Sequence, residues 1–571
     1  HEDATSGFLR ALARAETATA DANWGLAASL WAEVTAANPV EGWYWSMLGQ
    51  ARFKLDDFAG AQSAFERALE LRDGFPAETA YRIACCQAAR GEIDAALASF
   101  EQACALGYRS LAHAREDERL AALRDLPAFR ALTGMIDTAA LSRDEGWRAD
   151  LRYLTREIKR LAYAPYRYHP EATFDAMVEI INRAIPGLAD LQILIEMEKL
   201  LALLGDGHAG IYPSPAQDEN RQGLPVQFYL FEEGLFIIAA SGEHRDLLGA
   251  EVLAIGGHEL AALTAALEPL TCRDNEIWLK HSIPHRLRET RVLHALGLIP
   301  QDDRASLQIR DAAGRERDVD LVSDARYMRA NLQRHFFKPG EWVALPETLD
   351  APVPHSLKHM ELSYWFEVLS DDRTVYAQIN RVRDHPSEPL LSFTERLMDA
   401  AEAPDIDRLV LDLRWNPGGN TFLEMPLLHR LIGIDTGRGR SRFGSRKLNR
   451  NGHLFVIIGR ATFSAAQNFS TMLDRHTEAI FVGEPTGSSP TFVGETIDFQ
   501  LPYSGAYANV SDLLWQSGWA MDYRPWVAPL LYAPPAFALY KENRDPAMEA
   551  IAAVREHLPG LGMRDRDNPT I

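Results

Sequence analysis

Residues 408–420 read RLVLDLRWNPGGN, and residues 454–466 read LFVIIGRATFSAA. Each stretch begins with a continuously apolar run, which is typical of a strand that is buried on both faces of a sheet. Each run ends in a sharp turn of glycine or small residues. A third run at 375–382 and a predicted helix from about 389 to 401 come before them. This alternation of strands and helices predicts an α/β fold with a parallel sheet and crossover helices.

The first quarter of the chain contains an internal repeat. Four positions recur 35 residues further on: Gly49, Ala61, Phe65 and Ala68 are matched by Ala84, Ala96, Phe100 and Ala103. Small residues at this spacing let antiparallel helices approach closely, while the aromatic residue fills the gap to the next pair. The segment 43–71 closely resembles a tetratricopeptide repeat, and we expect about three repeats over residues 7–107. Such arrays bind peptides or partner proteins, although a rigid appendage that packs on the rest of the chain is an equal alternative.

Between the repeats and the α/β region, the pattern changes from helical to β-like. Residues 144–205 carry apolar residues at spacings of three and four, which predicts helices. From Leu224 onward short β-like runs follow, and LLGAEVLAIGGHEL at 247–260 resembles the core of a PDZ-type domain. We therefore divide the chain into six parts: a repeat domain (1–140), a helical part that carries a GDGH motif (141–222), a PDZ-like β-rich domain (223–336), a connector (337–364), an α/β core (365–555) and a tail (556–571).

Composition narrows the possible functions. The 571 residues are 47% hydrophobic and 24% charged, as in soluble globular proteins. The formal net charge of -21 disfavours nucleic-acid binding. The four cysteines (85, 86, 104 and 272) have neither zinc-ligand nor disulfide-framework spacing, and no uncharged apolar run is long enough to span a membrane. Because the chain starts at His1, we expect that a leader or tag has been removed, and an extracytoplasmic location fits a secretory leader.

Three motifs carry groups that acyl transfer requires. Gly418-Gly419 forms a turn after a buried strand, where backbone N–H groups can face an oxyanion. Ser464 lies in the first turn of a predicted helix, and His208 lies in a GDGH segment just beyond another helix. Taken singly, Ser464 could be a helix N-cap and His208 a structural residue. Together they supply a nucleophile, a base and an oxyanion site.

The motifs of this chain resemble those of a known family. The segments DLRWNPGGN, GRATFSAAQ and VGEPTG, following a GDGH, are similar to those of the tail-specific (C-terminal-processing) serine peptidases and the related tricorn-core peptidases. The resemblance covers about residues 145–550. It implies a ClpP/crotonase-like catalytic core with a PDZ-like insert, which hydrolyses peptide bonds through an acyl-enzyme. By position, Ser464 is implied as the nucleophile, and the N–H of Ala465 with that of Gly418 or Gly419 as the oxyanion hole.

The catalytic base differs between the two branches of this superfamily. Tail-specific members use a lysine a few tens of residues after the serine, but the first lysine after Ser464 is Lys541. The tricorn-like branch uses a histidine from the motif that here reads GDGH, which selects His208. That branch adds a late carboxylate, for which Asp522 is the best match; Glu484 and Glu495 are alternatives.

The chain departs from the family pattern at two positions. Gly207 stands where tricorn-type enzymes have a second catalytic serine beside the histidine. Ser488 follows VGEPTG where a further glycine is more usual. In addition, the segment from Gly437 to Arg450 contains six basic residues; it could hold a substrate carboxylate, although a solvated loop is the simpler interpretation.

The sequence therefore predicts a serine hydrolase, most simply a serine-type peptidase that acts on a peptide or protein substrate. The alternatives are a binding protein that keeps the fold without catalysis, and an esterase or amidase on the same core. We expect no cofactor and no metal, because no phosphate-binding loop, HExxH motif or cluster of ligand residues is visible. A protein partner could bind to the repeats.

Overall fold

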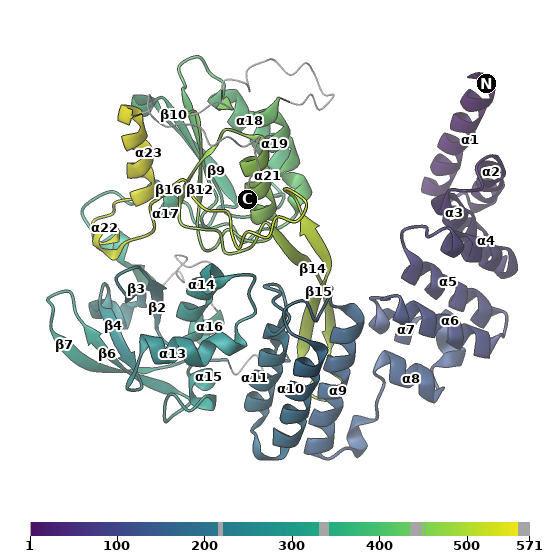
Figure 1. Cartoon of the computed structure of the whole chain (residues 1–571), viewed down its shortest axis with the longest axis horizontal. Helices are drawn as coiled ribbons and strands as arrows, with labels where there is room; N and C mark the ends of the chain where they lie inside the picture. Colours follow the sequence, from purple (N-terminus) through teal and green to yellow (C-terminus); the bar gives the residue numbers. More distant parts are fainter. Residues whose placement is uncertain (1, 215–220, 330–341, 434–447, 450–451, 558–571) are drawn as a thin grey trace. The chain divides into compact units, whose positions relative to one another are not determined.

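The computed structural model describes residues 2–214, 221–329, 342–433, 448–449 and 452–557 (Figure 1). The chain forms two compact units. Unit 1 comprises residues 1–162 together with the short segment 500–505, and unit 2 comprises residues 163–499 and 506–571. In the part of the chain that is described, no helix combines the length and the apolar character needed to cross a membrane.

Unit 1 is helical, as the sequence predicts. Consecutive helices pack as antiparallel pairs, and each pair packs against the next one (Figure 1). The helices of this unit are α1 (Glu2–Ala20), α2 (Trp24–Ala37), α3 (Gly42–Phe53), α4 (Phe58–Glu70), α5 (Pro76–Ala89), α6 (Ile93–Ala105), α7 (Leu111–Glu116), α8 (Pro127–Thr133) and α9 (Arg143–Leu161).

The 35-residue period corresponds to the helix pairs α3/α4 and α5/α6. Gly49 on α3 faces the ring of Phe65 on α4, and a Cβ atom at Gly49 would lie only 2.6 Å from that ring. Phe65 and the equivalent Phe100 are both fully buried. Small residues thus allow close helix contact while the aromatic rings fill the space between pairs.

Helix α9 belongs to unit 1, although the sequence assigned it to the helical part of the peptidase region (141–222). Its Arg160 donates to the backbone oxygen of Tyr108, and a Cβ atom at Gly134 would meet the ring of Tyr153 at 2.2 Å. The Asp150 carboxylate also accepts hydrogen bonds from two N–H groups of the segment 500–505. These contacts, which the helical periodicity does not encode, group α9 with the repeats.

The catalytic-core region of unit 2 contains a six-stranded sheet of order β16-β13-β12-β11-β10-β9. Five strands are parallel, and β9 is an antiparallel edge strand. The strands are β9 (Tyr364–Leu369), β10 (Thr374–Ile379), β11 (Arg408–Asp412), β12 (Leu454–Ile458), β13 (Ile480–Gly483) and β16 (Leu531–Tyr532). The predicted parallel α/β arrangement is confirmed.

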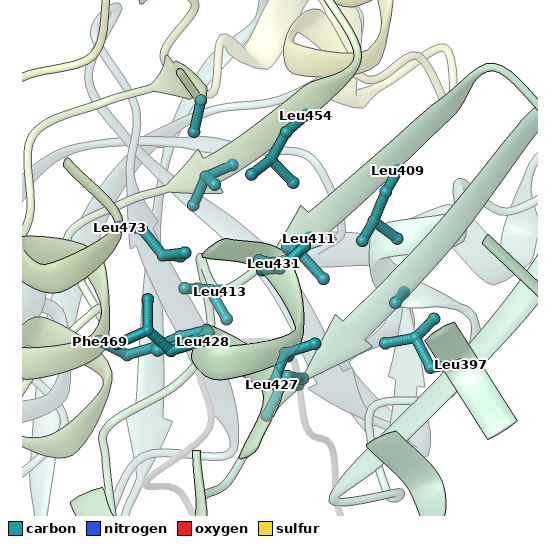
Figure 2. Close-up of a cluster of buried hydrophobic side chains, with 14 of the residues drawn as sticks. Leu397, Leu409, Leu411, Leu413, Leu427, Leu428, Leu431, Leu454, Phe469 and Leu473 are labelled. Carbon is teal, nitrogen blue, oxygen red and sulfur yellow. The ribbon is translucent and has the colours of Figure 1, made fainter. Parts of the chain in front are cut away.

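Helices cover both faces of this sheet, which explains why its central strands are apolar throughout. On one face, Leu409, Leu411 and Leu454 pack under α18 (Leu390–Ala401), α19 (Met425–Ile432) and α21 (Ala465–His476), as Figure 2 shows. On the other face, Val410 and Phe455 pack against α23 (Pro546–His557). Successive residues of a strand point to opposite faces, so both sets must be apolar.

A second, largely antiparallel sheet forms the region that the sequence compares with a PDZ-type domain. Its main strand order is β2-β3-β4-β6-β7, with β5 paired to β4 and β8 to β3. The strands are β2 (Val226–Leu230), β3 (Leu235–Ser241), β4 (Glu251–Ile255), β5 (His258–Glu259), β6 (Arg304–Arg310), β7 (Glu316–Val322) and β8 (Trp342–Ala344). Helices α13 (Leu260–Leu267), α14 (Glu276–Arg286) and α15 (Thr290–Ala295) lie between β5 and β6 in the chain.

A third, small sheet follows the GDGH segment in unit 2. Strand β1 (Gly210–Tyr212) follows this segment and pairs with β15 (Tyr507–Gln516), which neighbours β14 (Thr491–Gln500). The other helices are α10 (Glu171–Ala184), α11 (Asp190–Ala202), α16 (Ala325–Arg329), α17 (His355–Lys358) and α22 (Phe537–Tyr540). Most of the arginine-rich segment 437–450, nearly all of the tail from 558 and the start of the connector lie outside the described residues.

Candidate active site

Two turns meet at the carboxyl ends of the neighbouring parallel strands β11 and β12. The N–H of Phe463 donates to the backbone oxygen of Asn416 over 3.1 Å. The buried Thr462 hydroxyl donates to the Leu413 oxygen (2.9 Å) and accepts from the N–H of Gly459 (3.0 Å). These bonds join the turn that carries Ser464 to the turn that carries Gly418.

Ser464 has an unusual backbone conformation. Its φ of 55° and ψ of -122° lie in a region that residues with a Cβ atom rarely adopt, and helix α21 starts at the next residue. Its side chain makes no capping hydrogen bond to the helix. The helix N-cap interpretation therefore fails in its usual form, because the hydroxyl is not used to satisfy the helix N–H groups.

Gly418 packs directly against this serine. Its φ is +107°, and a Cβ atom there would lie 2.6 Å from the Ser464 Cβ and 2.8 Å from the Ala465 nitrogen. The Gly418 N–H donates to the Asn416 side-chain oxygen over 2.9 Å. The neighbouring Gly419 is exposed, and among the hydrogen bonds of the described residues none uses the N–H of Gly419 or of Ala465 as a donor.

His208 lies in the loop between α11 and β1, and its ring sits between two aromatic side chains. The centroid of the His208 ring is 4.6 Å from that of Phe463 and 5.5 Å from that of Phe492. The His208 and Phe492 rings are nearly parallel. Asn509 on β15 donates to the His208 backbone oxygen over 2.9 Å. The structure thus brings the GDGH segment against the residue that precedes Ser464, although 256 positions separate the histidine from the serine.

The carboxylate nearest to His208 belongs to Asp206, in the same GDGH segment. Its Oδ1 lies 3.9 Å from His208 Nδ1, and it accepts a hydrogen bond from the His208 N–H (2.8 Å). The Ser511 N–H and hydroxyl also donate to this buried carboxylate, over 3.0 and 3.1 Å. In the described part of the chain, His208 Nδ1 is buried and has no hydrogen-bond partner. The Asp206 Oδ1 atom, 3.9 Å away, lies slightly beyond hydrogen-bond distance.

The three carboxylates considered from sequence occupy other surroundings. Asp522 is bound by Arg524 (2.8 Å), which also pairs with Asp474 in the last turn of α21, about 14 Å along the helix from Ser464. The buried Glu484 pairs with Arg460 (2.7 Å). Glu495 is exposed on β14. Among the described contacts, none of these carboxylates hydrogen-bonds to His208.

The hydroxyl of Ser464 and the imidazole of His208 are not hydrogen-bonded to each other within the described structure. In unliganded active sites such a bond is often long or misaligned and shortens when substrate binds. Among the described residues, no group of three or more His, Cys, Asp or Glu side chains is arranged to hold a metal ion. The reactive groups that the structure gathers at this place are the Ser464 hydroxyl, the His208 imidazole and backbone N–H groups.

Comparisons with known proteins agree with this chemistry. Residues 375–506, which contain both turns, match peptidase family S41. The chain carries a peptidase family S41 domain. The protein is therefore an enzyme of the serine peptidase type.

Several solved structures are similar to this chain, and the two of CPAF share its fold. Mature CPAF complexed with lactacystin is 14% identical, with 73% of this chain and 98% of that chain covered and a TM-score of 0.51. A serine-to-alanine mutant of CPAF is also 14% identical, with 74% and 99% covered and a TM-score of 0.52. The tricorn protease is 14% identical as well, with 74% and 37% covered and a TM-score of 0.34.

Sequence reasoning on this S41 peptidase overlooked two acidic residues that surround the GDGH segment. Asp206 lies inside the motif, and its spacing of two residues from His208 was a usable signal, because an Asp side chain commonly accepts from the backbone two residues on. The other residue, Asp274, reaches the Gly207 N–H from a distant part of the chain. No local pattern in the sequence predicts the contact between Asp274 and Gly207.

Proposed function

We propose that this S41 peptidase hydrolyses peptide bonds through an acyl-enzyme, with Ser464 as nucleophile and His208 as general base. The observation that carries the proposal is the strained conformation of Ser464 at the start of α21, with Gly418 packed against it. Strain of this kind persists only where the surrounding structure enforces it, and it is typical of functional positions. The hydrogen bonds through Asn416 and Thr462 provide that enforcement.

In the proposed reaction the Ser464 Oγ attacks the carbonyl carbon of the scissile bond while His208 takes the hydroxyl proton. His208 then gives this proton to the amine as the C–N bond breaks, which leaves an ester on Ser464. A water molecule attacks the ester in the same way, with His208 again acting as base, and the acid product leaves.

For the oxyanion we propose the N–H groups of Ala465 and Gly419. Two donors of this kind stabilise the charge that develops on the carbonyl oxygen. Gly418 is the less suitable alternative, since its N–H already donates to Asn416. Its role is instead to leave space beside the Ala465 N–H that a Cβ atom would fill.

For the residue that orients His208 we favour Asp206 over Asp522. An imidazole base needs an acceptor on the nitrogen that does not face the nucleophile. Asp206 lies 3.9 Å from Nδ1, whereas Asp522 is held by Arg524 beside the far end of α21.

Labelling with a fluorophosphonate probe tests the nucleophile and the base. Wild-type protein should label, and Ser464→Ala and His208→Ala should each abolish labelling and peptide hydrolysis. Ser470→Ala is a matched control, because Ser470 is a buried serine of the same helix that donates to the Ala466 oxygen. Labelling that persists in Ser464→Ala would refute the assignment.

We also propose that the helix pairs of unit 1 are tetratricopeptide repeats that bind extended substrate or partner chains. A cavity of about 270 Å³ in this unit supports the proposal. Its walls combine aromatic rings with charged side chains of both signs, namely Phe53, Phe65, Tyr81 and Tyr108 with Lys54, Arg82, Arg119, Glu78 and Asp117. Such a lining suits an extended chain that carries both apolar and polar groups.

The double variant Lys54→Glu/Arg82→Glu tests this second role. It should lower kcat/KM for an unstructured protein such as casein and leave kcat/KM for a short fluorogenic peptide unchanged. If both substrates respond equally, the repeats do not select substrate.

A further inference from the structure

Asp274 connects two loops at the candidate active site. Its Oδ1 accepts a hydrogen bond from the N–H of Gly207, the residue before His208, over 2.8 Å. Its Oδ2 accepts a short hydrogen bond from the hydroxyl of Ser488, in the loop after β13. The carboxylate thus joins the GDGH segment to the loop that follows β13.

The element that carries Asp274 is firmly fixed. The next residue, Asn275, caps helix α14, and its side-chain amide donates to the backbone oxygens of Thr486 (3.2 Å) and Pro525 (2.7 Å). On the same helix, Trp278 stacks on the ring of Phe463 at 4.2 Å between centroids. Asp274 therefore has a fixed position relative to the turn that carries Ser464.

The two positions at which this chain departs from the family pattern are the two partners of Asp274. At Gly207, a Cβ atom would lie 2.9 Å from Asp274 Oδ1 and 2.9 Å from the Phe463 ring, so a serine there would collide with both. At position 488, a glycine would leave Oδ2 without its hydroxyl donor in a buried site. Glycine at 207 and serine at 488 therefore fit the presence of this carboxylate.

We propose that Asp274 is a positioning residue for peptide hydrolysis, whose carboxylate holds the His208 loop against the Ser464 turn in place of a side chain at position 207. This inference rests on the proposed roles of Ser464 and His208. Burial raises the pKa of the Asp274 carboxyl, while His208, Ser488 and the Gly207 N–H act in the opposite direction. Because Asp274 is hydrogen-bonded to the residue before His208, it also adds negative charge near the imidazole.

The charged groups around His208 are few in the described structure. Asp206 faces Nδ1 from within the loop, and Asp274 acts from the segment just before α14. The other neighbours are the rings of Phe463 and Phe492. The nearby Cys272 is neutral at physiological pH, because burial raises the pKa of its thiol well above the usual range. Removal of Asp274 therefore leaves Asp206 as the only one of these groups that can stabilise the imidazolium.

The test compares Asp274→Ala, Asp274→Asn and Ser488→Ala in the full-length chain. Asp274→Ala should lower kcat for a fluorogenic peptide and the rate of fluorophosphonate labelling by on the order of ten- to a hundred-fold, the effect of one lost hydrogen bond to a charged group. KM should stay within about two-fold, because substrate contacts are not removed. Asp274→Asn should recover part of the rate, since its side-chain oxygen can still accept from Gly207.

The pH profile separates positioning from a merely structural role. Loss of the Asp274 charge destabilises the imidazolium, so the acid limb of kcat/KM should move to lower pH in both Asp274 variants. Ser488→Ala keeps the charge and should leave the acid limb in place while kcat falls less. Asp246→Asn, at an exposed carboxylate that pairs with Arg317, is the matched control and should change neither kcat nor the limb.

Wild-type kcat and an unmoved acid limb in Asp274→Asn would overturn the inference. If Asp274→Ala does not fold, Asp274→Asn and Ser488→Ala decide the question. Failure of the proposed function is distinguishable, because it would appear as retained activity in Ser464→Ala or His208→Ala whatever Asp274 does.

Discussion

Replacement of Gly418 by alanine is the sharpest single test of the oxyanion geometry. The added Cβ atom would lie 2.6 Å from the Ser464 Cβ, 2.8 Å from the Ala465 nitrogen and 2.9 Å from the Phe463 oxygen. Carbon contacts this short do not persist, and two of the three atoms belong to the backbone, so the turn must shift. The shift displaces both Ser464 and the Ala465 N–H beside it.

Two effects set the magnitude. A residue with a side chain at φ +107° costs on the order of 1–3 kcal/mol of stability. Loss of one oxyanion donor typically lowers kcat by about 100- to 1,000-fold. We therefore expect Gly418→Ala to fold with a modestly lower Tm and to label with a fluorophosphonate at least about 100 times more slowly.

Gly257→Ala provides a matched control for backbone strain. Gly257 also has a positive φ, +82°, but a Cβ atom there would meet nothing within 4 Å. Its variant should lose comparable stability and keep the wild-type labelling rate and kcat. A wild-type labelling rate in folded Gly418→Ala would refute the oxyanion assignment, and equal activity losses in both variants would show that strain alone is responsible.

Three further predictions concern stability. Gly49→Ala should lower the free energy of unfolding by about 1–3 kcal/mol in thermal denaturation, because the buried Phe65 ring cannot move away from the added Cβ atom; unchanged stability would argue against the close helix contact. Burial lowers the pKa of His285 to about 4, so below the unfolded-state value of 6.5 only the unfolded chain gains this proton. The wild type should lose about 2 kcal/mol from this group between pH 7 and 5 in urea titrations, and His285→Gln should lose less. Glu484→Gln should cost about 3–5 kcal/mol, because the buried Arg460 charge loses its partner; its folded fraction should still label, which a catalytic carboxylate would not allow.

Much of the fold could be predicted because its signals are local. The apolar runs that became β11 and β12 had to be buried on both faces, and the parallel order follows from their alternation with helices. The close packing of Gly49 on Phe65 was likewise implied by a 35-residue period. The assignment of α9 to unit 1 was not, because its contacts, such as that of Arg160 with Tyr108, join segments far apart in the chain.

The candidate site was predictable only where its chemistry depends on backbone conformation. Gly418 has to be glycine because its φ and its contact with Ser464 exclude a side chain. The glycine in the sequence therefore indicates this backbone conformation. A carboxylate partner is under no such constraint, because Asp274 reaches Gly207 from a part of the chain 67 residues away. Asp522 matched the family by position, yet the charge of Arg524, only two residues further on, holds it elsewhere. The proposed nucleophile Ser464 and the proposed base His208 could thus be read from motifs, while the groups proposed to orient the histidine depend on which charges the folded chain brings together.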